Sequence, residues 1–230
     1  MNSTATKKRL LKDELYRQLA RVGKATSAPR RLELLDLLVQ APRTVESLAE
    51  ETGMSVANTS QHLQLLRGAG LVDASRAGLH VTYRLASPEV ASFLLAVRAL
   101  AEARLAEVER VKASFFTEAD DVSPMSASEL LRRARRGEAL VLDVRPAHEY
   151  QAGHLPMALC VPLGELRKRL ADLPRGKDVV AYCRGPYCVF AADAVRMLRK
   201  KGFRAFRFED GVSEWRARGL PIEVSSVGAP

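Results

Sequence analysis

The sequence has few cysteine, histidine or aromatic residues: its 230 residues include three Cys and four His, and 6% are aromatic. Three cysteines cannot form the disulfide framework of a small secreted domain, so we expect a reducing, cytoplasmic setting. No apolar run approaches the roughly 18 residues that a membrane span requires. The basic start lacks the apolar stretch of a secretory signal. We therefore expect neither membrane attachment nor export, and any conspicuous cysteine is a candidate for chemistry.

The remaining composition is that of a folded protein with one or two domains, at 47% hydrophobic and 27% charged residues. The formal net charge of +9 favours an acidic partner such as nucleic acid. Residues 1–120 hold 17 basic and 14 acidic side chains, and residues 121–230 hold 19 and 13. Because the excess is larger in the second half, charge alone does not locate a DNA-binding surface.

The two halves of the chain have different patterns. Residues 10–113 are mainly helical with one hairpin, and residues 126–222 alternate short apolar strands with amphipathic helices. An acidic stretch with a proline separates them. We predict a mainly α domain over 1–116, a linker over 117–125, an α/β domain with a central parallel sheet over 126–222, and a tail over 223–230.

Helical spacing in the first half predicts helices over 11–22, 31–38, 45–51 and 56–67, the last two capped by Thr44 and Ser55. Alternating apolar residues over 79–85, after a turn at 76–78, predict a half-buried hairpin strand. An apolar stripe then predicts one long helix, carrying Leu94, Val97, Ala101, Leu105, Val108 and Val111.

Two short helices around a glycine, followed by a ribbon, are the parts of a winged helix-turn-helix. The buried face of its second helix is expected to be Val56, Thr59, Leu63 and Leu66. Outward amide and imidazole groups of that helix can read base edges, and hairpin cations can reach phosphates or a minor groove. The candidate DNA contacts are Ser55, Asn58, Gln61, His62, Gln64, Arg67, Arg76, His80 and Arg84. The alternative is a solvated polar face.

The string Ser55–Val72, followed by a Tyr-Arg-Leu strand, resembles the ArsR (arsenic repressor-like) family of bacterial regulators over about residues 13–113. The resemblance implies a homodimer through residues 10–23 and 89–113 that reads a pseudo-palindromic operator, usually as a repressor. The alternative is that the 94–111 stripe packs on its own domain. The third helix lacks cysteine, and residues 86–116 lack both Cys and His. We therefore predict no metal site of the family's kind, and no cofactor.

In the second half, apolar runs over 139–144 and 178–183 predict buried strands, and a helix is predicted over 189–201. Cys183 stands where the second strand meets its helix, which is where α/β folds place ligands. Backbone N–H groups, the helix dipole and Arg184 are expected to lower the pKa of Cys183. Such a thiolate is both a nucleophile and the centre of an anion site. The alternative is a loop cysteine without a role.

The segments Asp143-Val-Arg145, Glu149–Ala158 and Cys183–Ala192, with Asp210-Gly and Glu214-Trp215, together resemble the rhodanese (sulfurtransferase) family over about 125–222. The resemblance implies that Cys183 accepts a sulfane sulfur as a persulfide, from thiosulfate or another donor. It places Asp143 and Arg145 near the active site, and gives Gly153 and His154 a role in the fold. Phosphatases of the related fold need Cys-x5-Arg, but position 189 is Val, so we predict no phosphatase activity.

Cys188 leaves two hypotheses open. It can attack a persulfide on Cys183 to form a disulfide, or it can pack as a small hydrophobe. Cys160 lies in an apolar strand, where packing is expected. The function predicted is a DNA-binding regulator whose rhodanese domain senses or transfers sulfane sulfur, or binds a small anion, at Cys183. The alternatives are a sulfurtransferase with a winged-helix tether, and a regulator with a catalytically idle rhodanese domain.

Overall fold

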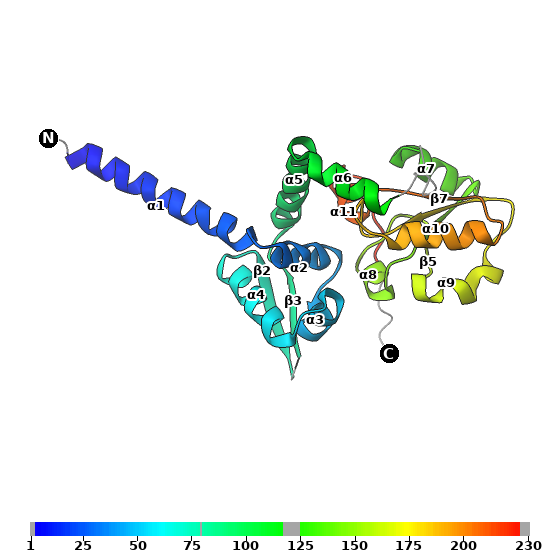
Figure 1. Cartoon of the computed structure of the whole chain (residues 1–230), viewed down its shortest axis with the longest axis horizontal. Coiled ribbons are helices and arrows are strands. Elements are labelled where there is room, and N and C mark those ends of the chain that lie inside the picture. The colour runs from blue at the N-terminus through cyan, green and yellow to red at the C-terminus, as the bar shows by residue number, and fades with distance from the viewer. Residues whose placement is uncertain (1–2, 79, 117–124, 226–230) are drawn as a thin grey trace. The chain divides into compact units, whose positions relative to one another are not determined.

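The computed structural model describes residues 3–78, 80–116 and 125–225. Residue 79 of the expected strand, most of the predicted linker and residues 226–230 of the predicted tail lie outside the described residues. The chain divides between Leu94 and Leu95 into two compact units (Figure 1). The elements up to this division are α1 Ser3–Thr26, α2 Pro29–Gln40, β1 Arg43–Thr44, α3 Val45–Thr52, α4 Val56–Gly68, β2 Val72–Ala77 and β3 His80–Leu85. Helix α5, Pro88–Arg104, begins in the first unit.

The helix boundaries of the first unit follow from local capping. The Thr44 side chain accepts a hydrogen bond from the Ser47 N–H at 3.2 Å, and Ser55 accepts one from the Asn58 N–H at 3.2 Å. Gly53, with φ +65°, ends α3 in the left-handed conformation that glycine adopts without steric cost. Both predicted caps are confirmed, and the two helices meet around a glycine as expected.

The core of the first unit lies where α2, α3 and α4 meet the three-stranded antiparallel sheet β1-β3-β2. Thr59, Leu63 and Leu66 are fully buried there, as the spacing predicted. Val56 is a correction, because its side chain is 49% exposed. It is the first residue of α4, directly after the cap, and the first turn of the helix lies beyond the core.

The apolar face of α1 is exposed. Leu10, Leu11, Leu15 and Leu19 keep between 55% and 66% of their surface exposed. Only the end of the helix, at Val22 and Ala25, packs against the core of the unit. Figure 1 shows α1 extending away from the other helices of its unit. The face is therefore apolar surface that this one chain does not cover.

The apolar stripe over 94–111 does not form one helix. Helix α5 ends at Arg104, Leu105 is extended with φ −115° and ψ 101°, and α6 runs over Ala106–Phe115. The break brings the Lys112 ammonium to 3.7 Å from the Glu102 carboxylate. A straight helix would separate these residues by about 15 Å along its axis. No glycine or proline stands at the break, so the local sequence does not predict it.

The second unit is an α/β domain with a four-stranded parallel sheet in the order β5-β4-β6-β7. Its predicted strands and helix are confirmed within one or two residues. The elements are α7 Ala127–Arg135, β4 Ala139–Asp143, α8 Ala147–Ala152, β5 Leu159–Cys160, α9 Leu163–Arg169, the 3-10 turn η1 Leu170–Asp172, β6 Asp178–Tyr182, α10 Phe190–Lys200, β7 Ala205–Arg207 and α11 Val212–Ala217.

Helices cover both faces of this sheet. Along β6, Val179 and Ala181 belong to the core cluster shared with α9 and α10, whereas Val180 and Tyr182 belong to the cluster shared with α7 and α11. All five residues of β6 are buried, as expected for a central parallel strand. The residues after the carboxyl end of β6 therefore follow a strand that is buried on both faces.

Within the described part of the chain, no helix is both long and apolar enough to cross a membrane.

Candidate functional site

The first candidate site is the outward face of α4. Asn58, Gln61, Gln64 and Arg67 are exposed on it, and His62 is half-buried. Ser55 caps the helix, so its hydroxyl already accepts a backbone hydrogen bond. The helix thus presents donors and acceptors from several turns, the arrangement that base-edge readout in a major groove requires.

The second part of this candidate site is the β2–β3 hairpin. Arg76, His80 and Arg84 are all exposed there. The Arg84 guanidinium donates to the Asp73 carboxylate at 3.2 Å, and Arg76 Nε donates to the Gly78 carbonyl at 3.1 Å. These cations lie on the hairpin that packs against α4, and phosphate contacts remain our prediction for them.

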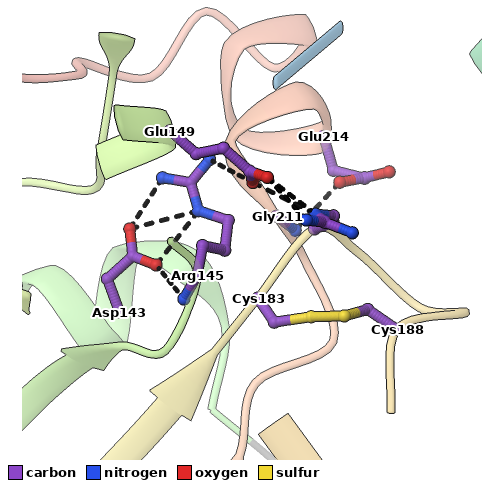
Figure 2. The surroundings of a disulfide bond; sticks show 8 residues. Asp143, Arg145, Glu149, Cys183, Cys188, Gly211 and Glu214 are labelled. Carbon is purple, nitrogen blue, oxygen red and sulfur yellow. Dashed lines mark hydrogen bonds and ion pairs between the residues drawn. A yellow bond between two sulfur atoms is a disulfide. The ribbon is translucent and has the colours of Figure 1, made fainter. Parts of the chain in front are cut away.

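The other candidate site is the loop Cys183–Cys188, which we call the sulfur loop. It follows β6 directly and leads into α10. A disulfide joins Cys183 to Cys188, with the two Cα atoms 6.3 Å apart, within the usual range for such a bond (Figure 2). Cys183 is buried, while Cys188 is half-buried. Cys188 is bonded to Cys183 and also packs against a core cluster of the second unit, so both hypotheses for Cys188 stay predictions.

Behind the loop, charged side chains alternate in sign: Asp143, Arg145, Glu149 and Arg184. Arg145 donates to both Asp143 oxygens, from Nε at 3.0 Å and from Nη2 at 2.6 Å, and also donates to the Gly153 carbonyl at 2.7 Å. The Arg145 and Asp143 side chains are fully buried. Burial lowers the pKa of Arg145, but the hydrogen bonds and charge of Asp143 outweigh it, so the pKa lies above its ordinary value.

Glu149 connects this buried pair to the sulfur loop. Its carboxylate accepts from Arg184 Nη2 at 2.7 Å and from Arg184 Nε at 3.0 Å, and lies 4.0 Å from Arg145 Nη1. Figure 2 shows the Glu149 side chain beside Arg145. Sequence reasoning expected Arg184 to add positive charge at Cys183. In the structure that charge is compensated by Glu149, because the two groups form a bidentate, largely buried pair.

A close backbone approach fixes the other side of the loop. A Cβ atom on Gly211 would lie 2.6 Å from the Arg184 carbonyl carbon and 2.8 Å from the Gly185 nitrogen. No side chain fits there without moving the loop backbone. Glu214 accepts from the Gly211 N–H at 2.9 Å, which secures the start of α11 against the loop. Gly185 itself has φ +131°, a region that only glycine adopts readily.

Cys160 lies apart from this pair, on β5. Its thiol is free and half-buried. Burial, assisted by the negative charge of Asp143, raises the pKa of Cys160 to about 11. It is therefore a poor nucleophile near neutral pH, in keeping with a packing role. No group of three or more His, Cys, Asp or Glu side chains is placed to hold a metal ion in the described residues.

The structure brings together five predicted residues of the second unit: Asp143, Arg145, Cys183, Arg184 and Cys188. Three more that sequence reasoning gave no site role lie beside them. Glu149, Gly211 and Glu214 belong to the motif segments of the rhodanese resemblance, which was the available signal. The His154 ring stacks on Tyr150, with centroids 3.6 Å apart, and is buried, consistent with a role in the fold.

Two family models match this chain. Residues 28–74 match the bacterial regulatory protein, arsR family, and residues 126–218 match the rhodanese-like domain. The HTH-type transcriptional regulator Rv0324 of Mycobacterium tuberculosis is 46% identical over 219 residues, covering 95% of each chain. The chain therefore belongs to the arsR family of regulators, in a form that carries a rhodanese-like domain. It is a transcriptional regulator of the ArsR type.

Each unit also has relatives of its own. A sulfurtransferase of Allochromatium vinosum is 33% identical over 91 residues, covering 40% of this chain and 84% of that protein. Among solved structures, the homodimeric winged helix-turn-helix DNA-binding domain Mb0332 of Mycobacterium bovis is similar, with 45% identity and a TM-score of 0.39. That match covers 41% of this chain and 87% of the domain.

Proposed function

We propose that this regulator binds operator DNA in the cytoplasm as a homodimer, and that sulfane sulfur arriving at Cys183 changes that binding. The observation that carries the proposal is the pairing of Cys183 with Cys188 inside one loop at the carboxyl end of β6. The cell's thiols keep a cytoplasmic pair of cysteines reduced. A disulfide there is therefore transient and regulatory, and not a permanent structural bond.

The chemistry has two balanced steps. The Cys183 thiolate attacks the outer sulfur of thiosulfate, forms a persulfide and releases sulfite. The Cys188 thiolate then attacks Cys183 Sγ and expels the outer sulfur as hydrosulfide. The two cysteine thiols lose two electrons and the sulfane sulfur gains them. The product is the Cys183–Cys188 disulfide, and no further oxidant is required.

Operator binding is assigned to the outward face of α4 and to the β2–β3 hairpin. Exposed Asn58, Gln61 and Gln64 supply hydrogen-bonding groups for base edges, and Arg67 and Arg76 supply charge for phosphates. Because two-fold dimers read two half-sites, the operator is expected to be a pseudo-palindrome.

The dimer interface is assigned to residues 10–23 and 89–113. Along α1, Leu11, Leu15 and Leu19 are each more than half exposed, which is costly for a contiguous apolar face in water. Leu100 and Val111 are likewise exposed on α5 and α6. A second copy of the chain would bury these side chains.

The test is DNA binding by the full-length protein to a fragment of its own upstream region, before and after treatment with thiosulfate. We expect the apparent affinity to change in the wild type and to stay constant in Cys183→Ser. The matched control is Cys160→Ser, which removes a cysteine outside the loop and should respond as the wild type does. Cys188→Ser separates the two steps, because it can form the persulfide but not the disulfide.

The rival function is sulfurtransfer as the main activity, with the winged helix as a tether. Its specific support is the sulfurtransferase relative of the second unit and the cysteine that the family's chemistry needs. Turnover of thiosulfate to an acceptor thiol, together with salt-insensitive or sequence-independent DNA binding, would favour this rival. Equal DNA affinity with and without thiosulfate in the wild type would overturn the sensing proposal.

A further inference from the structure

The last turns of α5 belong to the second unit and contact the surroundings of the sulfur loop. Arg98 Nη1 donates to Glu214 Oε1 at 2.6 Å. The two side chains are only 16% and 13% exposed, so solvent screens this ion pair less than it screens a surface pair. The other oxygen of Glu214 accepts from the Gly211 N–H. One carboxylate therefore joins α5 to the segment that supports the loop backbone.

This ion pair lies directly against Gly185. A Cβ atom on Gly185 would be 3.1 Å from Glu214 Oε1 and 3.4 Å from Arg98 Nη1. The loop backbone therefore has no free space toward the pair. A shift of the loop toward the pair at this position must move the Arg98 or Glu214 side chain.

A second contact joins α5 to the loop beside Cys188. The Tyr187 hydroxyl donates to the Glu102 carboxylate at 2.8 Å, and the Arg98 guanidinium lies 4.8 Å from the centre of the Tyr187 ring. Arg98 and Glu102 are four residues apart, so they share one face of the helix. That face contacts the loop between its two cysteines.

We propose that Arg98 and Glu102 are positioning residues of the sulfur site, which hold the loop in the geometry that joins Cys183 to Cys188. This inference rests on the proposed function and extends it to a route of regulation. Both residues lie outside the 126–218 match to the rhodanese-like domain, so this chain completes its sulfur site with a helix from elsewhere.

The contact acts in both directions. If the contacts of Arg98 and Glu102 favour the disulfide form of the loop, then disulfide formation favours those contacts by the same free energy. Helix α5 is continuous from Pro88, in the first unit, to Arg104. Arg98 and Glu102 therefore stand on the same helix that begins in the DNA-binding unit.

The test measures the equilibrium between the Cys183–Cys188 disulfide and its dithiol in full-length protein, in glutathione buffers of known potential. No DNA or sulfur donor is needed. We expect Arg98→Ala to weaken the disulfide about tenfold relative to the dithiol, which corresponds to about 30 mV. Arg98→Lys keeps the charge and should restore part of that loss. Arg135→Ala, an exposed cation on α7, is the matched control and should match the wild type.

A double-mutant cycle tests the second contact without touching the buried ion pair. Glu102→Gln and Tyr187→Phe should each weaken the disulfide, and the double variant should lose no more than Glu102→Gln alone, because Glu102→Gln already removes the contact with Tyr187 as well as the ion pair with Lys112. Sedimentation establishes that each variant keeps the oligomeric state of the wild type. Additive effects in the cycle, or potentials in all variants within error of the wild type, would overturn the inference.

The two proposals fail in different ways. If wild-type DNA binding responds to thiosulfate and the Arg98 and Glu102 variants respond identically with unchanged potentials, the sensing function stands and the positioning role is wrong. If the potentials shift as expected but DNA binding never responds, the positioning role stands and the sensing function is wrong.

Discussion

Replacing Gly211 with alanine tests whether the segment before α11 supports the sulfur loop. The added Cβ would lie 2.6 Å from the Arg184 carbonyl carbon, where ordinary carbon contacts are about 3.5 Å. The neighbours of the Cβ are backbone atoms of Arg184 and Gly185, which cannot rotate away as a side chain can. The loop must therefore shift by about 1 Å, or the segment that holds Glu214 must move outward.

Overpacking of this kind usually costs about 1–3 kcal/mol of stability. With a urea dependence of about 1–3 kcal/mol per molar, the unfolding midpoint should fall by on the order of 1 M. The assay is urea unfolding of the full chain, followed by fluorescence of Trp215. This residue is the single tryptophan and is buried in the second unit, so the signal reports on that unit.

The matched control is Gly164→Ala on α9. A Cβ there meets nothing within 4 Å, and alanine is favoured over glycine inside a helix by up to about 1 kcal/mol. Its midpoint should equal or exceed that of the wild type. The displaced loop in Gly211→Ala should also slow disulfide formation between Cys183 and Cys188. If Gly211→Ala unfolds at the wild-type urea concentration, the close approach is not what fixes the loop.

Three further predictions concern titratable side chains that are buried or partly buried in the second unit. Asp143→Asn should cost about 3–5 kcal/mol in the same unfolding assay, since it leaves Arg145 buried without its carboxylate; a loss below 1 kcal/mol would contradict this. Burial raises the pKa of Glu214, against the opposing charge of Arg98, so the folded state holds this proton more tightly than the unfolded state. Glu214 should therefore make stability fall as pH rises above 4.5 toward its raised pKa, and Glu214→Gln should flatten that fall; equal slopes of stability against pH in the two proteins would refute this. Because the pKa of Cys160 is about 11, iodoacetamide should modify Cys160 slowly in the folded protein near neutral pH and much faster after unfolding in urea, as mass spectrometry can follow; equal rates would show that Cys160 is not protected.

The secondary structure could be predicted largely because its signals are local. The side chain of a cap such as Thr44 or Ser55 accepts a hydrogen bond from an N–H three residues away. Strand β6 is marked in the sequence by a continuous apolar run. Two expectations failed where the outcome depends on distant residues. The burial of Val56 depends on how far the core extends over α4, and the break at Leu105 accompanies contacts that α6 makes after turning.

Only those parts of the candidate site that are close together in the sequence could be predicted, because the other contacts depend on distant residues. The position of Cys183 follows from the strand–loop–helix order, and its partner Cys188 is five residues away. Glu149 and Arg184 are separated by 35 positions, and Arg98 and Glu214 by 116. Periodicity carries no information about such pairs, because each forms only once the sheet has brought its elements together. Arg98 in particular has no sequence signal that marks it as part of a sulfur site.

The ion pairs Arg184–Glu149 and Arg98–Glu214 affect the relative stability of two products at the sulfur loop, the Cys183 persulfide and the Cys183–Cys188 disulfide. Arg184 is matched by Glu149 and Arg98 by Glu214, so the cations beside the loop are already compensated. A persulfide anion on Cys183 would add negative charge near two largely buried carboxylates, which is unfavourable in a poorly solvated site. The disulfide with Cys188 is neutral and expels that charge as hydrosulfide. The electrostatics of the loop therefore favour completion of the second step, and Cys188→Ser should leave a persulfide that is quickly lost to small thiols.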